Sequence, residues 1–159
     1  MRTLLITAVL AIAAAAGGAP IAAAAGADPV VGTWQLNVSK STFTAGQAVK
    51  SQTRTYSQSG DSISVDIKSV GADGKASTTH TSYQFNGKDA PVTGNRDYDT
   101  LLPKRVDSNT AEFTLKKGGK VVGMTSRTVS KDGATLTSKT NITTATGEKS
   151  ENVLVFDRK

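Results

Sequence analysis

Cysteine is absent from all 159 residues of this sequence, which excludes disulfides, thiol catalysis, cysteine-ligated metal sites and a lipid-anchored cysteine. Histidine occurs once, as His80, and no Gly-x-Ser-x-Gly motif accompanies it. Nucleophilic catalysis needs a base within hydrogen-bond reach of an activated hydroxyl or thiol, and this chain has few groups that qualify. We therefore predict no catalytic residue, no metal ligand and no cofactor.

Hydrophobic runs long enough to span a bilayer are also lacking. The short apolar run Leu4–Ile12 follows the positively charged Arg2 and precedes an Ala/Gly-rich stretch, an order typical of a secretory signal peptide. Cleavage after Ala27 or after Ala25 fits the small-x-small rule, and we prefer Ala27. The prediction is a signal peptide over residues 1–27 and an exported protein, periplasmic in a cell with two membranes and extracellular otherwise.

Removing 27 of the 159 residues leaves 132, a length typical of a single domain, with 18 basic and 13 acidic residues. The lysines and arginines are scattered rather than clustered, and no nucleic-acid-binding motif accompanies them. We therefore predict no nucleic-acid partner and no integral membrane segment in the mature domain, residues 28–159. We expect this domain to be a monomer.

Turn dipeptides recur at a regular spacing in the mature domain, and most contain a glycine that supplies the positive φ of tight hairpins. They are Gly60-Asp61, Asp73-Gly74, Asn86-Gly87, Ser108-Asn109, Gly118-Gly119, Asp132-Gly133 and Thr146-Gly147. The runs between them are rich in Thr, Val, Ile, Tyr and Phe, and several alternate apolar with polar residues. This pattern predicts β-strands joined in sequential hairpins.

The pattern gives nine strands, at residues 31–38, 51–57, 62–70, 77–85, 101–106, 111–116, 121–129, 135–143 and 152–158. Strands joined in sequence form an up-and-down meander, and closure into a barrel removes its two exposed edges. We therefore predict an all-β fold, an antiparallel up-and-down meander closed into a barrel of about eight to ten strands. A two-sheet sandwich is the alternative, although only residues 39–50 and 88–100 form the long connections that it normally needs.

Gly32-Thr33-Trp34, at the start of the first predicted strand, resembles the Gly-x-Trp signature of lipocalins and their relatives in the calycin superfamily. The stretch Val31–Leu36 is similar to the start of the fatty-acid-binding proteins, and Val153–Arg158 to their closing strand. Overall the chain resembles the small exported bacterial proteins described as lipocalin-like. The resemblance implies a lipocalin-like barrel whose base is plugged by Gly32 and Trp34, with Arg158 lying across the indole.

Two features depart from the fatty-acid-binding proteins. Those proteins close their barrel with a helical pair after the first strand, and residues 39–50 are too few for such a lid. They also bind the ligand carboxylate through an Arg-x-Tyr pair on the last strand, where this sequence has Leu154 and Phe156. The resemblance therefore implies no carboxylate site on the last strand.

The predicted function is an exported binding protein that holds a small hydrophobic or amphipathic ligand inside the barrel. The predicted ligand-binding residues are Ile63, Val65, Ile67, His80, Tyr83, Phe85, Phe113, Leu115, Met124 and Leu136. One alternative is a non-enzymatic envelope interaction protein with a filled barrel. Another is a barrel isomerase or cyclase that uses His80 or a tyrosine, with Tyr56, Tyr83, Tyr98 and Arg54 as further polar groups.

The role of His80 depends on which face of its strand is inside. Tyr83 and Phe85 lie on one face of the alternating pattern, and His80 lies on the other with Ser82 and Gln84. If the aromatic face forms the core, His80 is exposed or paired with a neighbour. If the polar face lines a wet cavity, His80 becomes the best acid–base residue of the chain.

Overall fold

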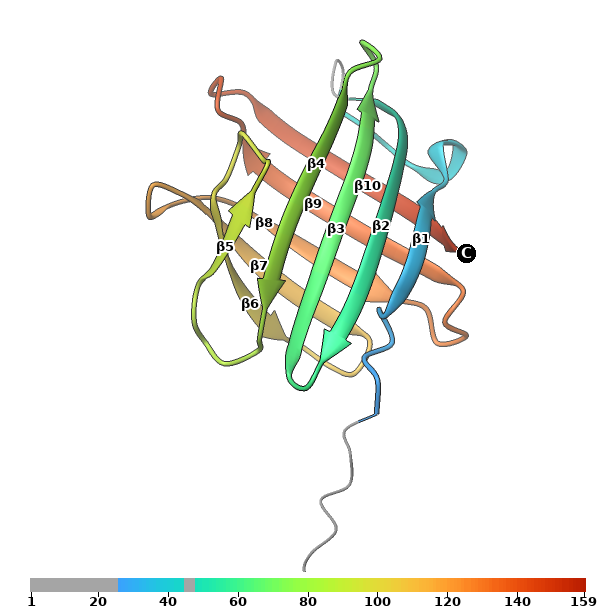
Figure 1. Ribbon diagram of the computed structural model, residues 1–159. Helices are drawn as coiled ribbons and strands as arrows, with labels where there is room; N and C mark the ends of the chain where they lie inside the picture. Colours follow the sequence, from blue (N-terminus) through green and yellow to red (C-terminus); the bar gives the residue numbers. More distant parts are fainter. Residues whose placement is uncertain (1–25, 45–47) are drawn as a thin grey trace, which may run out of the picture.

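The computed structural model describes residues 26–44 and 48–159, and it shows ten antiparallel strands closed into a barrel (Figure 1). The strands are β1 (Gly32–Leu36), β2 (Val49–Ser59), β3 (Ser62–Gly71), β4 (Ala76–Tyr83), β5 (Ala90–Thr93), β6 (Thr100–Arg105), β7 (Thr110–Lys117), β8 (Lys120–Val129), β9 (Thr135–Thr143) and β10 (Lys149–Arg158). Each strand pairs with its neighbours in the chain, and β1 pairs with β10 to close the sheet. The predicted all-β meander barrel is confirmed, and the sandwich alternative is wrong.

Most of the predicted signal peptide lies outside the residues that the structure describes. Of the predicted signal peptide, residues 1–27, only Gly26 and Ala27 belong to the described residues. A short 3₁₀ turn, Val38–Lys40, follows β1. Within the described residues, no helix has the length and apolar character needed to cross a bilayer.

The sequence predicts a long connection over residues 88–100, but the structure places the short strand β5 there. Its four residues include Pro91, which has no N–H to donate to a ladder, and each side of β5 registers only two residue pairs. The hydroxyl of Thr81 donates to the Pro91 carbonyl oxygen at 2.8 Å and supplements this thin pairing. A strand this short, with proline in it, has no alternating pattern from which to be recognised.

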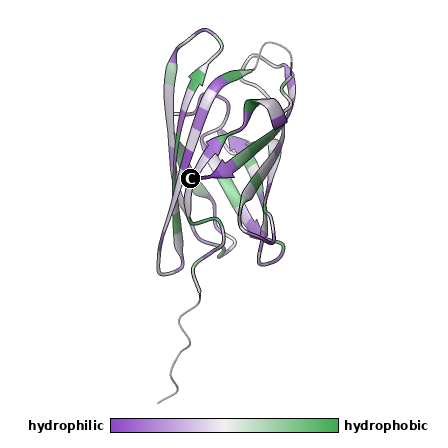
Figure 2. Ribbon diagram, turned by 90° about the vertical axis from the view of Figure 1, so that its right-hand side faces the viewer, coloured by the Kyte–Doolittle hydropathy of each residue, from purple (hydrophilic) through white to green (hydrophobic). Residues whose placement is uncertain are grey.

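Hydrophobic and hydrophilic residues follow one another along the strands (Figure 2). Because successive side chains of a strand point to opposite faces, this alternation sorts them between the interior and the outer surface. In β3, Ile63 and Val65 are 2% and 4% exposed, whereas Asp66 faces out and pairs with His80 of β4. The interior of the lower half of the barrel is thereby filled with apolar side chains, among them Leu136 and Phe156, which are fully buried.

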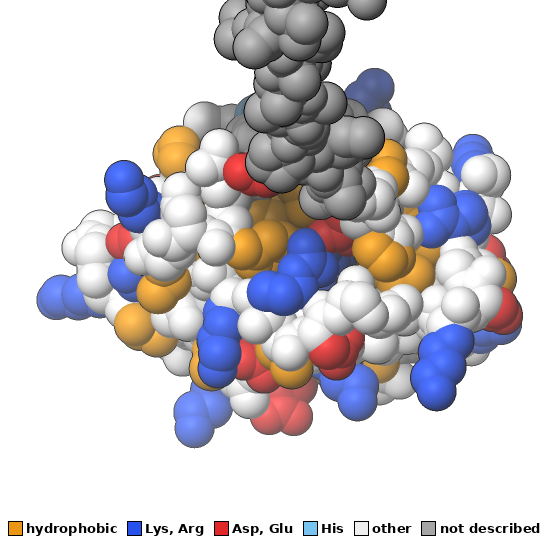
Figure 3. Space-filling view, turned by 90° about the horizontal axis from the view of Figure 1, so that it is seen from below, with side chains coloured by type: hydrophobic (Ala, Val, Ile, Leu, Met, Phe, Trp, Pro, Cys, Tyr) orange, Lys and Arg blue, Asp and Glu red, His pale blue; other side chains and the backbone are white. Residues whose placement is uncertain are grey.

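The base of the barrel is closed by the residues that lead into β1. Val30 and Trp34 are fully buried, and the indole N–H of Trp34 donates to the Val30 carbonyl oxygen at 2.8 Å. The Asp28 carboxylate accepts hydrogen bonds from Arg105 and from the backbone N–H of Val30. Seen from below, hydrophobic side chains gather near the centre of this end, and lysines and arginines stand around them (Figure 3).

Candidate functional site

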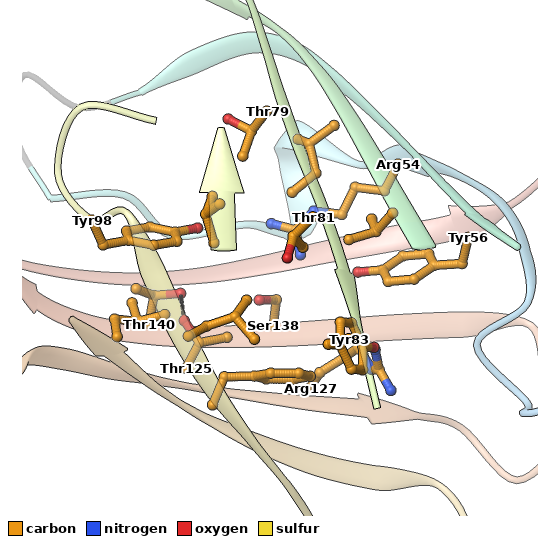
Figure 4. Close-up of a pocket in the computed structure, with 16 residues that line it drawn as sticks. Arg54, Tyr56, Thr79, Thr81, Tyr83, Tyr98, Thr125, Arg127, Ser138 and Thr140 are labelled. Atoms are coloured by element: carbon orange, nitrogen blue, oxygen red, sulfur yellow. Dashed lines mark hydrogen bonds between the residues drawn. The ribbon is translucent and has the colours of Figure 1, made fainter. Parts of the chain in front are cut away.

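A cavity of about 100 Å³ lies inside the barrel, bounded by eight strands, β2 to β9, and by the loop between β5 and β6 (Figure 4). Its lining combines aliphatic, aromatic, hydroxyl and guanidinium groups. The lining residues are Arg54, Tyr56, Val65, Ile67, Thr79, Thr81, Tyr83, Val92, Tyr98, Leu101, Phe113, Leu115, Thr125, Arg127, Ser138 and Thr140. Side chains of the barrel therefore leave this part of the interior unfilled.

The cavity adjoins a wider recess of about 590 Å³ at the mouth of the barrel, opposite the plugged base. The two spaces share four lining residues, Arg54, Ile67, Thr79 and Tyr98. The recess is otherwise bounded by the β3–β4 hairpin, by the loop between β5 and β6, and by Phe43 and Leu154. A route from the solvent to the inner cavity thus passes Arg54 and Tyr98.

Arg127 is the most unusual group in the cavity, because a guanidinium group that is only 3% exposed carries a charge in the barrel interior. The residues registered with it on the neighbouring strands are small, Ala111 on β7 and Ser138 on β9, which leaves room for the long side chain. One terminal nitrogen of Arg127 donates to the hydroxyl of Tyr83, and the guanidinium carbon lies 5.3 Å from the ring centroids of both Tyr56 and Phe113.

Two polar atoms in this region are buried and have no hydrogen-bond partner among the described residues: Nε of Arg127 and Oγ of Ser138. Other polar side chains nearby are satisfied, since the hydroxyls of Thr125 and Thr140 lie 2.6 Å apart and Thr81 bonds to the backbone. Buried polar groups in folded proteins are almost always bonded, so two unsatisfied atoms on adjacent strands require an explanation.

The charged residues that line the cavity are all of one sign, positive. Arg54 and Arg127 both line it, and none of its lining residues is Asp or Glu. Asp28 acts on Arg127 only at longer range, because its carboxylate is bonded to Arg105 at the base. The guanidinium of Arg54 lies 4.5 Å from the ring centroid of Phe156, and its Nε donates to the side chain of Gln52.

Two of the cavity tyrosines, Tyr83 and Tyr98, stay protonated at neutral pH. Burial raises the pKa of Tyr83 to about 12, and burial also raises the pKa of Tyr98. The Tyr83 hydroxyl accepts a hydrogen bond from Arg127, so its own hydrogen is free to be donated to a third group. The charged side chains that line the cavity therefore offer positive charge and no negative charge, and its hydroxyl groups add further hydrogen-bond donors.

The predicted ligand-binding residues divide into three sets. Five of them line the cavity: Val65, Ile67, Tyr83, Phe113 and Leu115. Three lie inside the barrel but away from the cavity lining, because Ile63 and Phe85 border a recess at the base and Leu136 is fully buried in the core.

His80 and Met124 lie on the outer surface, so their expected place in the barrel interior is corrected. The imidazole of His80 is about half exposed and its Nδ1 lies 2.8 Å from Oδ1 of Asp66, as expected if the aromatic face of the strand is the core. No group of three His, Asp or Glu side chains suited to a metal ion occurs in the described part of the chain. Met124 is 50% exposed because β8 turns Thr125 and Arg127 inward.

The predicted plug residues meet at the base. The guanidinium carbon of Arg158 lies 4.1 Å from the ring centroid of Trp34, and its three nitrogens donate to the carbonyl oxygens of Gly133, Val31 and Pro29. Gly32 has a φ of 133°, and a Cβ at this position would lie 2.6 Å from Nη1 of Arg158. Glycine is thus required both by the backbone and by the arginine that passes over it.

Sequence reasoning missed Arg127 and Ser138. The signal was present in the alternation of β8, where an inward Val129 places Arg127 on the same face. Met124, the larger apolar residue, favoured the opposite face. The residue types argued against both positions, because arginine and serine are usually exposed.

Neither a protein-family model nor a curated protein matches this sequence. Among solved structures, EF1p2_mFAP2b bound to DFHBI is 12% identical, with a TM-score of 0.51 over 82% of this chain and 94% of that chain. A redesigned β-barrel, mFAP1, bound to DFHBI is 16% identical, with a TM-score of 0.48 over 82% of this chain and 95% of that chain. The first likeness shows the barrel fold alone.

Proposed function

We propose that this protein binds a small amphipathic ligand inside its barrel, entering through the mouth. The observation that carries the proposal is the unfilled interior, a cavity of about 100 Å³ that continues into the recess of about 590 Å³ at the mouth. Ligand sites are concave, mostly apolar and fitted with a few polar groups, and the mouths of β-barrels are a common place for them. The barrel EF1p2_mFAP2b holds DFHBI, so the shared fold is compatible with this use.

The mixed lining favours an amphipathic ligand over a purely apolar one. Val65, Ile67, Leu101 and Leu115 supply aliphatic surface, whereas Arg54 and Arg127 supply charge. A hydrocarbon alone would leave these guanidinium groups without compensation in a confined space. The same cavity speaks against the alternative of a filled barrel, and the outward position of His80 removes it as the interior base of an isomerase or cyclase.

We also propose that the protein is an exported, monomeric, lipocalin-like protein of bacterial type, periplasmic or extracellular. The support is the order of charged, apolar and small residues before Asp28, together with the Gly-x-Trp motif at the plugged base. Both predicted cleavage sites precede Asp28, whose backbone N–H donates to Oε1 of Gln58 at 2.8 Å. Cleavage at either site would leave the base intact.

Native mass spectrometry of the protein purified from its own periplasm or medium tests these proposals together. We expect a monomer that begins at Asp28 or Gly26 and carries a reproducible small mass released on denaturation. A clean ligand-free mass that persists after lipid extract is added back would contradict the binding function and favour an interaction protein. An intact mass that includes residues 1–25 would contradict the export proposal.

A further inference from the structure

We propose that Asn86 is a site of spontaneous deamidation, in which the backbone nitrogen of Gly87 attacks the Asn86 side chain. The two residues lie in the exposed connection between β4 and β5, and Asn86 borders the recess at the base of the barrel. Neither residue lines the cavity, so this modification site is separate from the proposed ligand site.

The sequence distinguishes Asn86 from the other asparagines. The chain contains six asparagines, and Asn86 alone is followed by glycine. Because glycine has no Cβ, its backbone nitrogen can approach the preceding side chain closely. The other five asparagines precede residues with bulky side chains, which obstruct this approach; they are Asn37, Asn95, Asn109, Asn141 and Asn152.

The attacking nitrogen lies in an open part of the surface. Asn86, Gly87 and Lys88 are all exposed, and a Cβ placed on Gly87 would have nothing but its chain neighbours within 4 Å. Among the described residues, none accepts a hydrogen bond from the Gly87 N–H. Attack by this nitrogen therefore breaks no hydrogen bond of the folded chain.

Hydrogen bonds orient the side chain that is attacked. Oδ1 of Asn86 accepts from the backbone N–H of Lys88 at 3.1 Å, and its Nδ2 donates to Oε1 of Gln84 at 3.0 Å. Negative charge develops on Oδ1 when the nitrogen adds to Cγ, and a donor already placed at this oxygen stabilises that charge. The Lys88 N–H thus supports the reaction as well as the turn.

Asn109, in the turn between β6 and β7 at the same end of the barrel, is a protected asparagine by comparison. The nitrogen that would attack it belongs to the β-branched Thr110, whose N–H donates to Oδ1 of Asp107 at 2.8 Å. Nδ2 of Asn109, the group that would leave, donates to the carbonyl oxygen of Val129 at 3.2 Å. Deamidation at Asn109 would therefore break two hydrogen bonds of the fold.

The reaction needs only water as a co-reactant. A bond forms between the Gly87 nitrogen and Cγ of Asn86, the Cγ–Nδ2 bond breaks, and Nδ2 leaves as ammonia with the proton of the Gly87 amide. Water then opens the cyclic imide at either carbonyl and yields aspartate or isoaspartate. The new carboxylate adds a negative charge to a recess that Asp28, Asp61 and Arg105 also line.

Ion-exchange chromatography of the purified protein, kept at mildly alkaline pH both folded and in urea, tests the proposal. We expect a more acidic form to accumulate in the folded protein at a rate within about tenfold of the rate in urea. Peptide mapping should place aspartate and isoaspartate at position 86. Asn86→Gln should abolish this form, whereas Asn109→Gln, the matched control in the neighbouring turn, should deamidate as the wild type does.

Gly87→Ala provides a second variant, and we expect it to slow the reaction at least about tenfold. It should do so in urea as well, where the strain of alanine at a φ of 73° has no effect. Folded protein that deamidates more than about tenfold more slowly than the chain in urea would overturn the proposal. An acidic form that persists in Asn86→Gln at the wild-type rate would overturn it too.

Discussion

Two of the arginines that lie against aromatic rings, Arg158 at the base and Arg127 in the cavity, differ in their surroundings. Arg158 at the base lies across Trp34, and all three of its nitrogens donate to backbone carbonyl oxygens at 2.6–2.8 Å. Within the described residues, Arg127 in the cavity lies beside Tyr56 and Phe113, donates only to Tyr83, and has no partner for its Nε.

This difference separates a structural arginine from a functional one. A guanidinium group whose donors are all satisfied within the chain stabilises the fold that it belongs to. A buried guanidinium group with an unsatisfied donor reduces the stability of the empty protein, and its donor is available to a ligand. The base of the barrel is thus closed by an arginine whose nitrogens are all bonded, whereas the upper interior, as far as the structure describes it, keeps an unsatisfied donor beside the cavity.

The largest expected effect is at the base. Trp34→Ala removes a fully buried indole and the hydrogen bond to Val30, and we expect it to lower the free energy of unfolding by about 3–5 kcal/mol. Chemical denaturation followed by circular dichroism measures this. Trp34→Phe should lower the free energy of unfolding by less than Trp34→Ala, since phenylalanine keeps a buried aromatic ring. A loss below about 1 kcal/mol for Trp34→Ala would show that the plug does not hold the base.

Arg158→Met should have the next largest effect on the free energy of unfolding. It removes three hydrogen bonds to the backbone and the stacking over Trp34, at a position that is partly open to solvent, so we expect a loss of about 1–2 kcal/mol. The same denaturation experiment applies. Arg158→Lys should recover only part of the loss, because an ammonium group cannot donate in three fixed directions. Full recovery by lysine would mean that charge alone matters at the base.

Removing the arginine of the cavity should not lower the free energy of unfolding, unlike the substitutions at the base. Arg127→Met combined with Tyr83→Phe removes a buried charge together with its one hydrogen-bonded partner. We expect the ligand-free protein to be as stable as the wild type or more stable by up to about 2 kcal/mol, as with other buried charges replaced by apolar groups. A loss above about 2 kcal/mol in ligand-free protein would make Arg127 a structural residue like Arg158.

The smallest expected effect is on the pH dependence of stability. It comes from aspartates in turns, which occur at both ends of the barrel. A hydrogen bond from Ser130 lowers the pKa of Asp132 at the base, and one from the backbone N–H of Gly118 lowers the pKa of Asp99 near the mouth. A lowered pKa in the folded state adds stability above the unfolded pKa of about 3.9, and this is lost as pH falls through the folded value.

Acid titration of stability checks this last prediction. The free energy of unfolding should decline below about pH 4, and Asp132→Asn and Asp99→Asn should each flatten the decline slightly. Both groups should contribute similarly. A steep loss from one variant alone would reveal an asymmetry between the ends that the hydrogen bonds do not explain.

Much of the fold follows from the sequence, because alternation in strands such as β3 and the turn dipeptides are local signals. The plug was also accessible, through the resemblance of Gly32-Thr33-Trp34 to the lipocalin signature, and the pairing of the first and last strands brings Arg158 to Trp34. β5 was not accessible, because its pairing depends on neighbours on both sides rather than on its own residues. Arg127 was hidden for a related reason, since its burial follows from barrel closure around it.

The central claim is the proposal that the cavity beside Arg127 binds a small amphipathic ligand, and NMR of the arginine Nε–H groups tests it most directly. Arg127→Met and Arg158→Met would assign the two resonances. During titration with octanoate, the Arg127 Nε–H signal should shift saturably and exchange more slowly with water, whereas that of Arg158, already bonded to Gly133, should stay in place. An Arg127 signal that does not move while octanoate binds would contradict the account.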